Sequence, residues 1–154
     1  MNRPNPVTSG ILRANLVDID ARQMVAAALE WRDGVIIAIQ RDAAPDPALP
    51  YLLPGFVDAH VHIESSMLVP SEFARLAVRH GTVASVSDPH EIANVLGEYG
   101  VRFMLDNAAQ SPFHFLFGAP SCVPATPFES AGATLDAAAV ARLLDLPQIG
   151  YLSA

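Results

Sequence analysis

The stretch that decides the fold is Leu53-Pro54-Gly55-Phe56-Val57-Asp58-Ala59-His60-Val61-His62. Its apolar residues, broken by polar ones, predict a strand over residues 52–63. Because residues two apart on a strand point to the same face, we expect Asp58, His60 and His62 to project together. Two neighbouring imidazoles can bind one divalent ion through their ring nitrogens, or they can satisfy local hydrogen bonds. The residues alone leave both interpretations open.

After this strand, the sequence alternates between strand and helix patterns. We expect strands over residues 82–87, 113–118 and 148–152, and helices over residues 71–80, 98–109 and 136–144. Strands that alternate with helices form right-handed βαβ units around a parallel sheet. The pattern therefore predicts an α/β fold.

The residues before this strand have a different pattern. Strands are expected over residues 11–19, 24–31 and 35–40, and Arg32-Asp33-Gly34 is typical of a hairpin turn. Pro45, Pro47 and Pro50 interrupt the next segment, so residues 41–50 are expected to form a linker. We therefore predict a β-rich N-terminal subdomain with a Pro-rich linker over residues 1–50, and a second region over residues 51–154.

Composition excludes several classes of protein. Hydrophobic residues make up 51% and charged residues 16%, which suits a packed core and not a disordered chain. A net charge of -7 argues against a nucleic-acid partner. A single cysteine excludes a cysteine-built zinc site, and the absence of lysine excludes a carbamylated-lysine metal bridge. No membrane span or secretory signal is expected, so we predict a cytoplasmic protein.

Four stretches together resemble the adenine deaminase family of the metal-dependent amidohydrolase superfamily. They are the opening stretch, Ile63-Glu64-Ser65-Ser66-Met67, Asp88-Pro89-His90-Glu91-Ile92-Ala93-Asn94-Val95 and Pro120-Ser121-Cys122-Val123-Pro124-Ala125-Thr126. This resemblance spans roughly residues 10–150. It implies a small N-terminal β-sandwich portion, followed by the first three to four β/α units of an incomplete TIM-like amidohydrolase barrel. It also implies hydrolysis of adenine, a purine base, to hypoxanthine and ammonia.

The resemblance assigns a divalent metal, manganese, iron or zinc, to His60 and His62. It further indicates that Asp88, His90 and Glu91 are catalytic, without separating metal ligand from proton shuttle. From the residues alone, Asp88 can equally belong to a turn, with His90 and Glu91 opening a helix whose N-terminus favours an acid.

Weaker candidates surround these residues. Glu64, Ser65 and Ser66 are expected to line the substrate end, although a solvated loop after a strand is almost as good an interpretation. Cys122 follows the third strand of the second region, where its thiol could touch a base. A small buried side chain is the favoured interpretation of Cys122.

The resemblance also implies further ligands beyond those found here. A complete barrel needs about 250 residues, and Ser153 stands about where a bridging glutamate is expected. We therefore expect a truncated deaminase that can be inactive alone, with a homo-oligomer or a partner completing the barrel. The alternatives are another amidohydrolase acting on a cyclic amide, and a non-catalytic remnant that binds metal or a homologous subunit.

Overall fold

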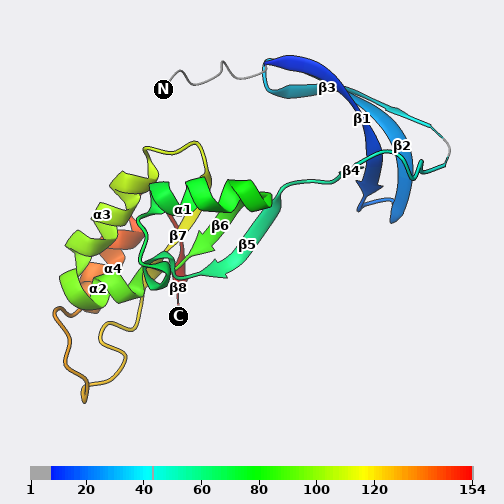
Figure 1. Ribbon diagram of the computed structural model, residues 1–154. Helices are drawn as coiled ribbons and strands as arrows, with labels where there is room; N and C mark the ends of the chain where they lie inside the picture. The colour runs from blue at the N-terminus through cyan, green and yellow to red at the C-terminus, as the bar shows by residue number, and fades with distance from the viewer. Residues whose placement is uncertain (1–7, 43, 154) are drawn as a thin grey trace. The chain divides into compact units, whose positions relative to one another are not determined.

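The computed structural model describes residues 8–42 and 44–153. The chain divides between Pro54 and Gly55 into two compact units, each built on its own four-stranded sheet (Figure 1). No helix in the described ranges is long and apolar enough to cross a membrane.

The first unit contains a sheet with the strand order β3-β2-β1-β4. Its strands are β1 (Ser9–Asp18), β2 (Gln23–Arg32), β3 (Val35–Arg41) and β4 (Tyr51–Leu52). The first three strands are antiparallel neighbours, whereas β4 runs parallel to β1. The three expected N-terminal strands are confirmed with shifts of one or two residues at their ends.

The turn between β2 and β3 follows from its residues. Asp33 and Gly34 have φ angles of 50° and 78°. A two-residue hairpin turn whose central residues both have positive φ matches the twist of the strands, and Asp-Gly tolerates that conformation.

A small apolar cluster and one buried amide stabilise the first sheet. Leu16, Val25 and Ala27 are buried together. Asn15, which is 2% exposed, binds the predicted linker: its Nδ2 donates to the carbonyls of Asp46 and Leu49 at 2.7 and 3.1 Å. The segment expected to be a linker is thus fixed against β1. The described residues of this unit form a single sheet, so the β-sandwich stays a prediction.

The second unit contains a parallel sheet whose strands follow the chain order β5-β6-β7-β8. Its strands are β5 (Phe56–Val61), β6 (Thr82–Ser87), β7 (His114–Pro120) and β8 (Ile149–Ser153), and its helices are η1 (Ile63–Ser66), α1 (Pro70–Ala77), η2 (Val78–His80), α2 (His90–Leu96), α3 (Glu98–Ala108) and α4 (Ala137–Leu144). The predicted alternation of strands and helices is confirmed. In the described residues the sheet is open, and its closure into a barrel stays a prediction.

Helices cover one face of the parallel sheet (Figure 1). Phe117 of β7 and Leu143 of α4 belong to one buried cluster with side chains of α2 and α3. Leu116 precedes the buried Phe117 and Leu152 precedes the buried Ser153, but the two leucines are 46% and 57% exposed. The parallel sheet therefore buries its helix-covered face more completely than the opposite one.

The predicted strand over residues 52–63 is wrong in its extent. It is divided into β4, which pairs with β1 of the first sheet, and β5, which pairs with β6 of the second. Pro54 has no backbone N–H to donate to a ladder, so the strand pattern breaks before Gly55. The boundary between the units falls in this break.

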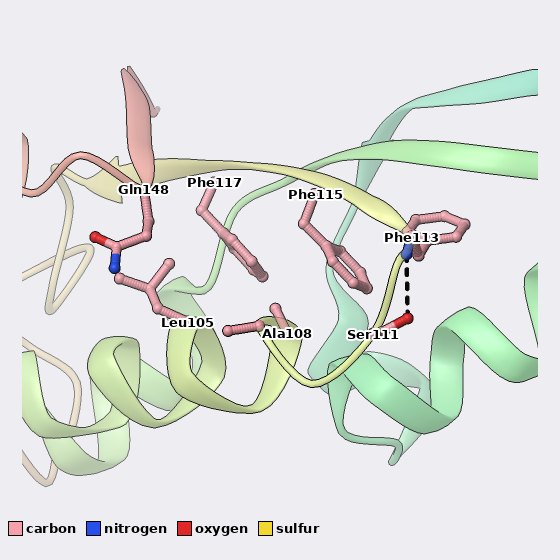
Figure 2. A pocket seen from close by; sticks show the side chains of 8 residues that line it. Leu105, Ala108, Ser111, Phe113, Phe115, Phe117 and Gln148 are labelled. Carbon is pink, nitrogen blue, oxygen red and sulfur yellow. Dashed lines mark hydrogen bonds between the residues drawn. The ribbon is translucent and has the colours of Figure 1, made fainter. Parts of the chain in front are cut away.

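A pocket of about 220 Å³ lies between α3 and the sheet. Figure 2 shows the rings of Phe115 and Phe117 pointing toward Leu105 and Ala108 of α3. The other residues that line this pocket are Ala109, Ser111, Phe113 and Gln148. Since none of these side chains titrates, this pocket offers no acid–base chemistry.

Candidate metal and proton-transfer site

The candidate residues lie where β5 and β6 end. His60 is on β5 and His62 follows it, whereas Asp88 follows β6 and His90 and Glu91 begin α2. The carboxyl ends of parallel strands meet at one edge of a sheet, which is where α/β proteins place their reactive groups. The topology thus brings together side chains about thirty positions apart.

His60 and His62 turn toward one another. Their Nε2 atoms are 3.0 Å apart, and the ring centroids are 5.0 Å apart. Two nitrogen ligands at about 2.0–2.1 Å from a tetrahedral zinc ion lie about 3.4 Å from each other. The observed separation is therefore close to the spacing that a shared ion requires.

The contacts of Nδ1 of His62 determine which of its ring nitrogens is available to bind a metal ion. Its Nδ1 lies 3.1 Å from the backbone carbonyl of Asp88 and 3.1 Å from Oε2 of Glu91. Because a carbonyl oxygen only accepts hydrogen bonds, Nδ1 carries the hydrogen and Nε2 of neutral His62 is bare. Metal-binding histidines commonly donate their second N–H to a carboxylate or a carbonyl in this way. The donor set of His60 and His62 fits a divalent ion.

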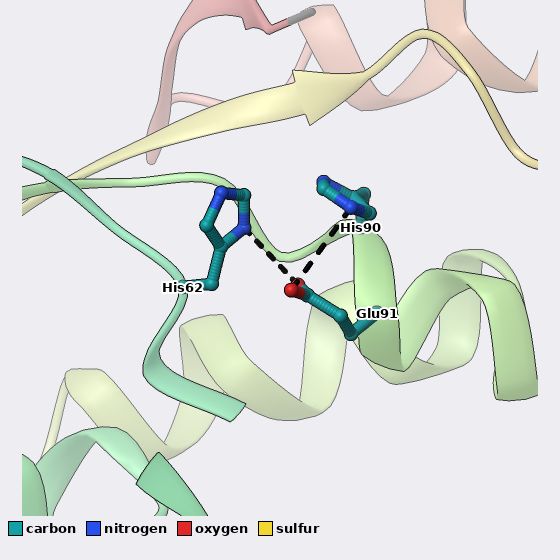
Figure 3. Close-up of side chains that lie close together, drawn as sticks. All are labelled: His62, His90 and Glu91. Atoms are coloured by element: carbon teal, nitrogen blue, oxygen red, sulfur yellow. Dashed lines mark hydrogen bonds and ion pairs between the residues drawn. The ribbon is translucent and has the colours of Figure 1, made fainter. Parts of the chain in front are cut away.

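A second set of ligand atoms shares His62. Ligand atoms of His62, His90 and Glu91 lie within 4.8 Å of one another (Figure 3). Use of Nδ1 of His62 as a ligand would require that atom to be bare, which conflicts with its contact to the Asp88 carbonyl. We therefore favour Nε2 of His60 and Nε2 of His62 as the metal ligands. Glu91 would then orient His62 through its contact with Nδ1.

Asp88 orients His90. Oδ2 of the buried Asp88 carboxylate lies 2.9 Å from Nδ1 of His90, and Nε2 of His90 lies 4.0 Å from Oε1 of Glu91. Burial lowers the pKa of His90, but the hydrogen bond and charge of Asp88, with the charges of Glu91 and Glu64, outweigh it and raise the pKa overall. Asp88 and His90 thus form an acid–base pair beside His62.

Glu64 and Ser65 also reach this group. Ser65 Oγ donates to Oε1 of Glu91 at 3.1 Å, and Oε1 of Glu64 accepts the backbone N–H of Ile92 at 3.2 Å. Burial raises the pKa of Glu64, and the charge of Glu91 adds to that effect against two backbone hydrogen bonds. Glu64 therefore stabilises the first turn of α2, and Ser65 helps to orient the Glu91 carboxylate.

The structure also shows the surroundings of Ser66, Cys122 and Asp58. Ser66 Oγ donates to the carbonyl of Ile63 at 2.6 Å, a local contact within η1. Cys122 is exposed, so its interpretation as a small buried side chain is wrong, and its thiol lies 3.5 Å from Oγ of neighbouring Ser121. A register shift between Asp58 and Val61 interrupts the strict alternation expected for β5, and Asp58 Oδ1 accepts the backbone N–H of His60.

Strand β8 makes contacts that the sequence did not predict, although Ser153 stands about where a bridging glutamate was expected. Ser153 Oγ lies 2.9 Å from Oδ1 of Asp88, and the Tyr151 hydroxyl donates to the carbonyl of Ser87 at 3.0 Å. Burial raises the pKa of Tyr151, and the charge of Asp88 adds to it. No local motif predicts these two contacts, because the partners are more than sixty positions away in the chain.

The sheet, its helices and the histidine pair at the strand ends are features of metal-dependent hydrolases. Residues 51–148 match the Amidohydrolase family, and the chain belongs to it.

Its relatives include adenine deaminases, which confirms the predicted resemblance. The adenine deaminase of Sulfurovum sp. is 59% identical over 142 residues, covering 92% of this chain and 26% of the relative. That of Salinibacter ruber is 58% identical over 144 residues, again covering 92% and 26%. The chain therefore spans about a quarter of the length of these relatives. A crystal structure of an uncharacterized protein matches 88% of this chain and 42% of its own with a TM-score of 0.44 and 13% identity, a likeness too slight to carry an argument.

Proposed function

We propose that this chain supplies metal ligands and proton-transfer residues to an adenine deaminase, which converts adenine and water to hypoxanthine and ammonia. One observation carries the proposal: His60, His62, Asp88, His90 and Glu91 are linked by contacts in a chain that is 59% identical to an adenine deaminase. The four parallel strands would form part of a TIM-like barrel. A cytoplasmic location stays a prediction.

In this proposal, Nε2 of His60 and Nε2 of His62 hold a divalent ion, which is manganese, iron or zinc. When bound, such an ion supplies a water molecule that ionises near neutral pH. Glu91 and the Asp88 carbonyl keep the hydrogen of His62 on Nδ1. They thereby keep its Nε2 available as a ligand.

Deamination also requires a proton to leave the attacking water and another to reach the departing amino nitrogen. His90 is the proposed shuttle, because its Nδ1 hydrogen is directed at Asp88 and its Nε2 is then bare in the neutral ring. Glu91 stands 4.0 Å from that nitrogen and can exchange a proton with it after a small movement. Glu64 and Ser65 would line the purine end of this site.

Activity is tested by incubating the purified chain, loaded with manganese, iron or zinc, with adenine. Hypoxanthine is followed by chromatography and ammonia by a coupled assay. Release of both products supports the proposed reaction. Turnover of a cyclic amide in place of adenine would favour another amidohydrolase, and absence of both metal and turnover would favour a non-catalytic remnant.

The ligand assignment is tested by metal content. His60→Ala and His62→Ala together are expected to lose the bound ion. His114→Ala is the matched control, because His114 is an exposed histidine at the start of β7, at the opposite end of the parallel strands from the site. Full metal content in the double variant would contradict the assignment. His90→Gln is expected to keep the metal and lose turnover, which separates a proton shuttle from a ligand.

A further inference from the structure

Strand β8 contacts the proposed site across an intervening strand. The sheet order places β7 between β6 and β8. Nevertheless, the Tyr151 hydroxyl reaches the carbonyl of Ser87, the last residue of β6, and Ser153 Oγ reaches the carboxylate of Asp88, the next residue. Two side chains of β8 therefore fix the end of β6.

Gly118 of β7 makes this reach sterically feasible. A Cβ atom at position 118 would lie 2.7 Å from Cβ of Ser153 and 2.7 Å from the Tyr151 ring. Such separations are far inside ordinary carbon–carbon contact distances of about 3.5–4.0 Å. Because Gly118 has no side chain, the Tyr151 and Ser153 side chains of β8 have the space to reach the end of β6.

Asp88 connects this contact to the imidazoles of His62 and His90. Its Oδ1 faces Ser153 and its Oδ2 faces Nδ1 of His90, each at 2.9 Å. Its backbone carbonyl faces Nδ1 of His62 at 3.1 Å. A carboxylate with a hydrogen-bond partner at each oxygen has one preferred orientation. Ser153 therefore helps to keep Oδ2 of Asp88 facing Nδ1 of His90, and this contact favours the His90 hydrogen on Nδ1.

Ser153 has a second acceptor available. The carbonyl of Ala119 also lies 2.9 Å from Ser153 Oγ, and a hydroxyl has a single hydrogen to donate. A hydrogen bond to an ionised acceptor is roughly twice as strong as one to a neutral acceptor. Asp88 is therefore the favoured acceptor.

We infer that Ser153 is a positioning residue that holds the Asp88 carboxylate and thereby keeps the His90 hydrogen on Nδ1, with Nε2 bare and directed toward Glu91. The chemical purpose of this arrangement rests on the proposed function. The arrangement itself is a property of the folded chain and can be measured without turnover.

The test uses nitrogen-15 spectra of the histidine side chains in the metal-free chain, which distinguish a protonated ring nitrogen from a bare one. His90 is assigned from the spectrum of His90→Gln. In the wild-type chain, we expect His90 to show a protonated Nδ1 and a bare Nε2. In Ser153→Ala, we expect this single signature to be lost to a mixture of the two tautomers.

Three further variants make the result specific. Ser153→Thr keeps the hydroxyl and is expected to restore the wild-type signature of His90. Ser153→Cys nearly keeps the side-chain volume, but a thiol is a weak hydrogen-bond donor, so its His90 signature should resemble that of Ser153→Ala. The cysteine variant takes the place of Ser153→Ala if the alanine variant does not fold. Ser85→Ala is the matched control, since Ser85 is a buried serine on β6 whose hydroxyl pairs with Ser87 and not with Asp88.

An unchanged His90 signature in Ser153→Ala or Ser153→Cys would overturn the inference, as would an equal change in Ser85→Ala. Signals of His80 and His114, which lie on other elements, should stay constant throughout. Where the wild-type chain deaminates adenine, turnover by Ser153→Ala should fall roughly 10- to 100-fold and Ser153→Thr should recover it. Absence of both bound metal and turnover in the wild-type chain would contradict the proposed function, while the spectra would still decide the role of Ser153.

Discussion

The antiparallel sheet β3-β2-β1-β4 and the parallel sheet β5-β6-β7-β8 each contain four strands, but they differ in what their side chains pack against. The antiparallel sheet buries a small cluster of three apolar side chains and one amide, Asn15. The parallel sheet packs against helices and buries side chains from α2, α3, α4 and its own strands. Ladder and turn geometry matter most in the first sheet, whereas tertiary packing matters most in the second.

Two spectroscopic probes follow the sheets separately. Trp31, the single tryptophan, lies on β2, so its fluorescence reports on the first sheet. All the described helices belong to the second unit, so helical circular dichroism reports on that unit. Urea unfolding with both probes can therefore test where each substitution acts.

The largest effect is expected for the core of the second unit. Leu143→Ala should lower its free energy of unfolding by about 2–5 kcal/mol, because Leu143 is completely buried and its loss leaves a cavity. Leu144→Ala in the same helix is the control, since Leu144 is 42% exposed. Equal losses for both variants would contradict the conclusion that helix packing stabilises this unit.

The next effect concerns the buried amide of the first sheet. Asn15→Ala should lower the stability of that sheet, measured by Trp31 fluorescence, by about 1–3 kcal/mol, because the carbonyls of Asp46 and Leu49 lose their donor. Arg13→Gln on the same strand removes an exposed ion pair with Asp42 and should change stability by less than about 0.5 kcal/mol. An unchanged unfolding midpoint in Asn15→Ala would show that residues 46–50 do not depend on this contact.

A smaller effect is expected at the β2–β3 turn. Gly34→Ala should cost about 1–2 kcal/mol, because an L-residue is strained at a φ angle of 78° even though open space surrounds the position. Gly34→Asn should cost less, since asparagine tolerates the left-handed conformation. If the two variants unfold at the same urea concentration, backbone strain does not determine the stability of this hairpin.

The smallest effect concerns the ion pair between Glu98 of α3 and Arg142 of α4. The hydrogen bond to Arg142 lowers the pKa of Glu98 below its ordinary value of 4.5, against a smaller opposing effect of burial. The ionised pair therefore stabilises the fold above pH 4.5, and the stabilisation is lost as the pH falls through the lowered pKa. Glu98→Gln should cost about 0.2–1 kcal/mol at neutral pH, and the difference from wild type should vanish in acid.

A double-mutant cycle with Arg142→Gln isolates this pair. The two single variants should lose similar amounts at neutral pH, and the double variant should lose little more than either. Additive losses would show that the pair contributes no coupling energy between α3 and α4.

By itself, the sequence determined most of the local structure. The limits of β6 were predicted to the residue, because Gly81 ends the helix before it and Asp88-Pro89 follows it. Helix α4 begins after Asp136, whose carboxylate accepts the Ala139 N–H at 2.8 Å. The sequence also placed His60 and His62 close together, because a strand brings residues two apart to one face. These features depend on neighbours in the chain.

Only the tertiary structure decided the rest. It divided the predicted strand over residues 52–63 between two sheets, because β4 finds its partner in β1 and β5 finds its partner in β6. It also placed Ser153 against Asp88, 65 positions away, through the space left by Gly118. Contacts of this kind arise from the order of strands in a sheet, which local sequence periodicity does not encode.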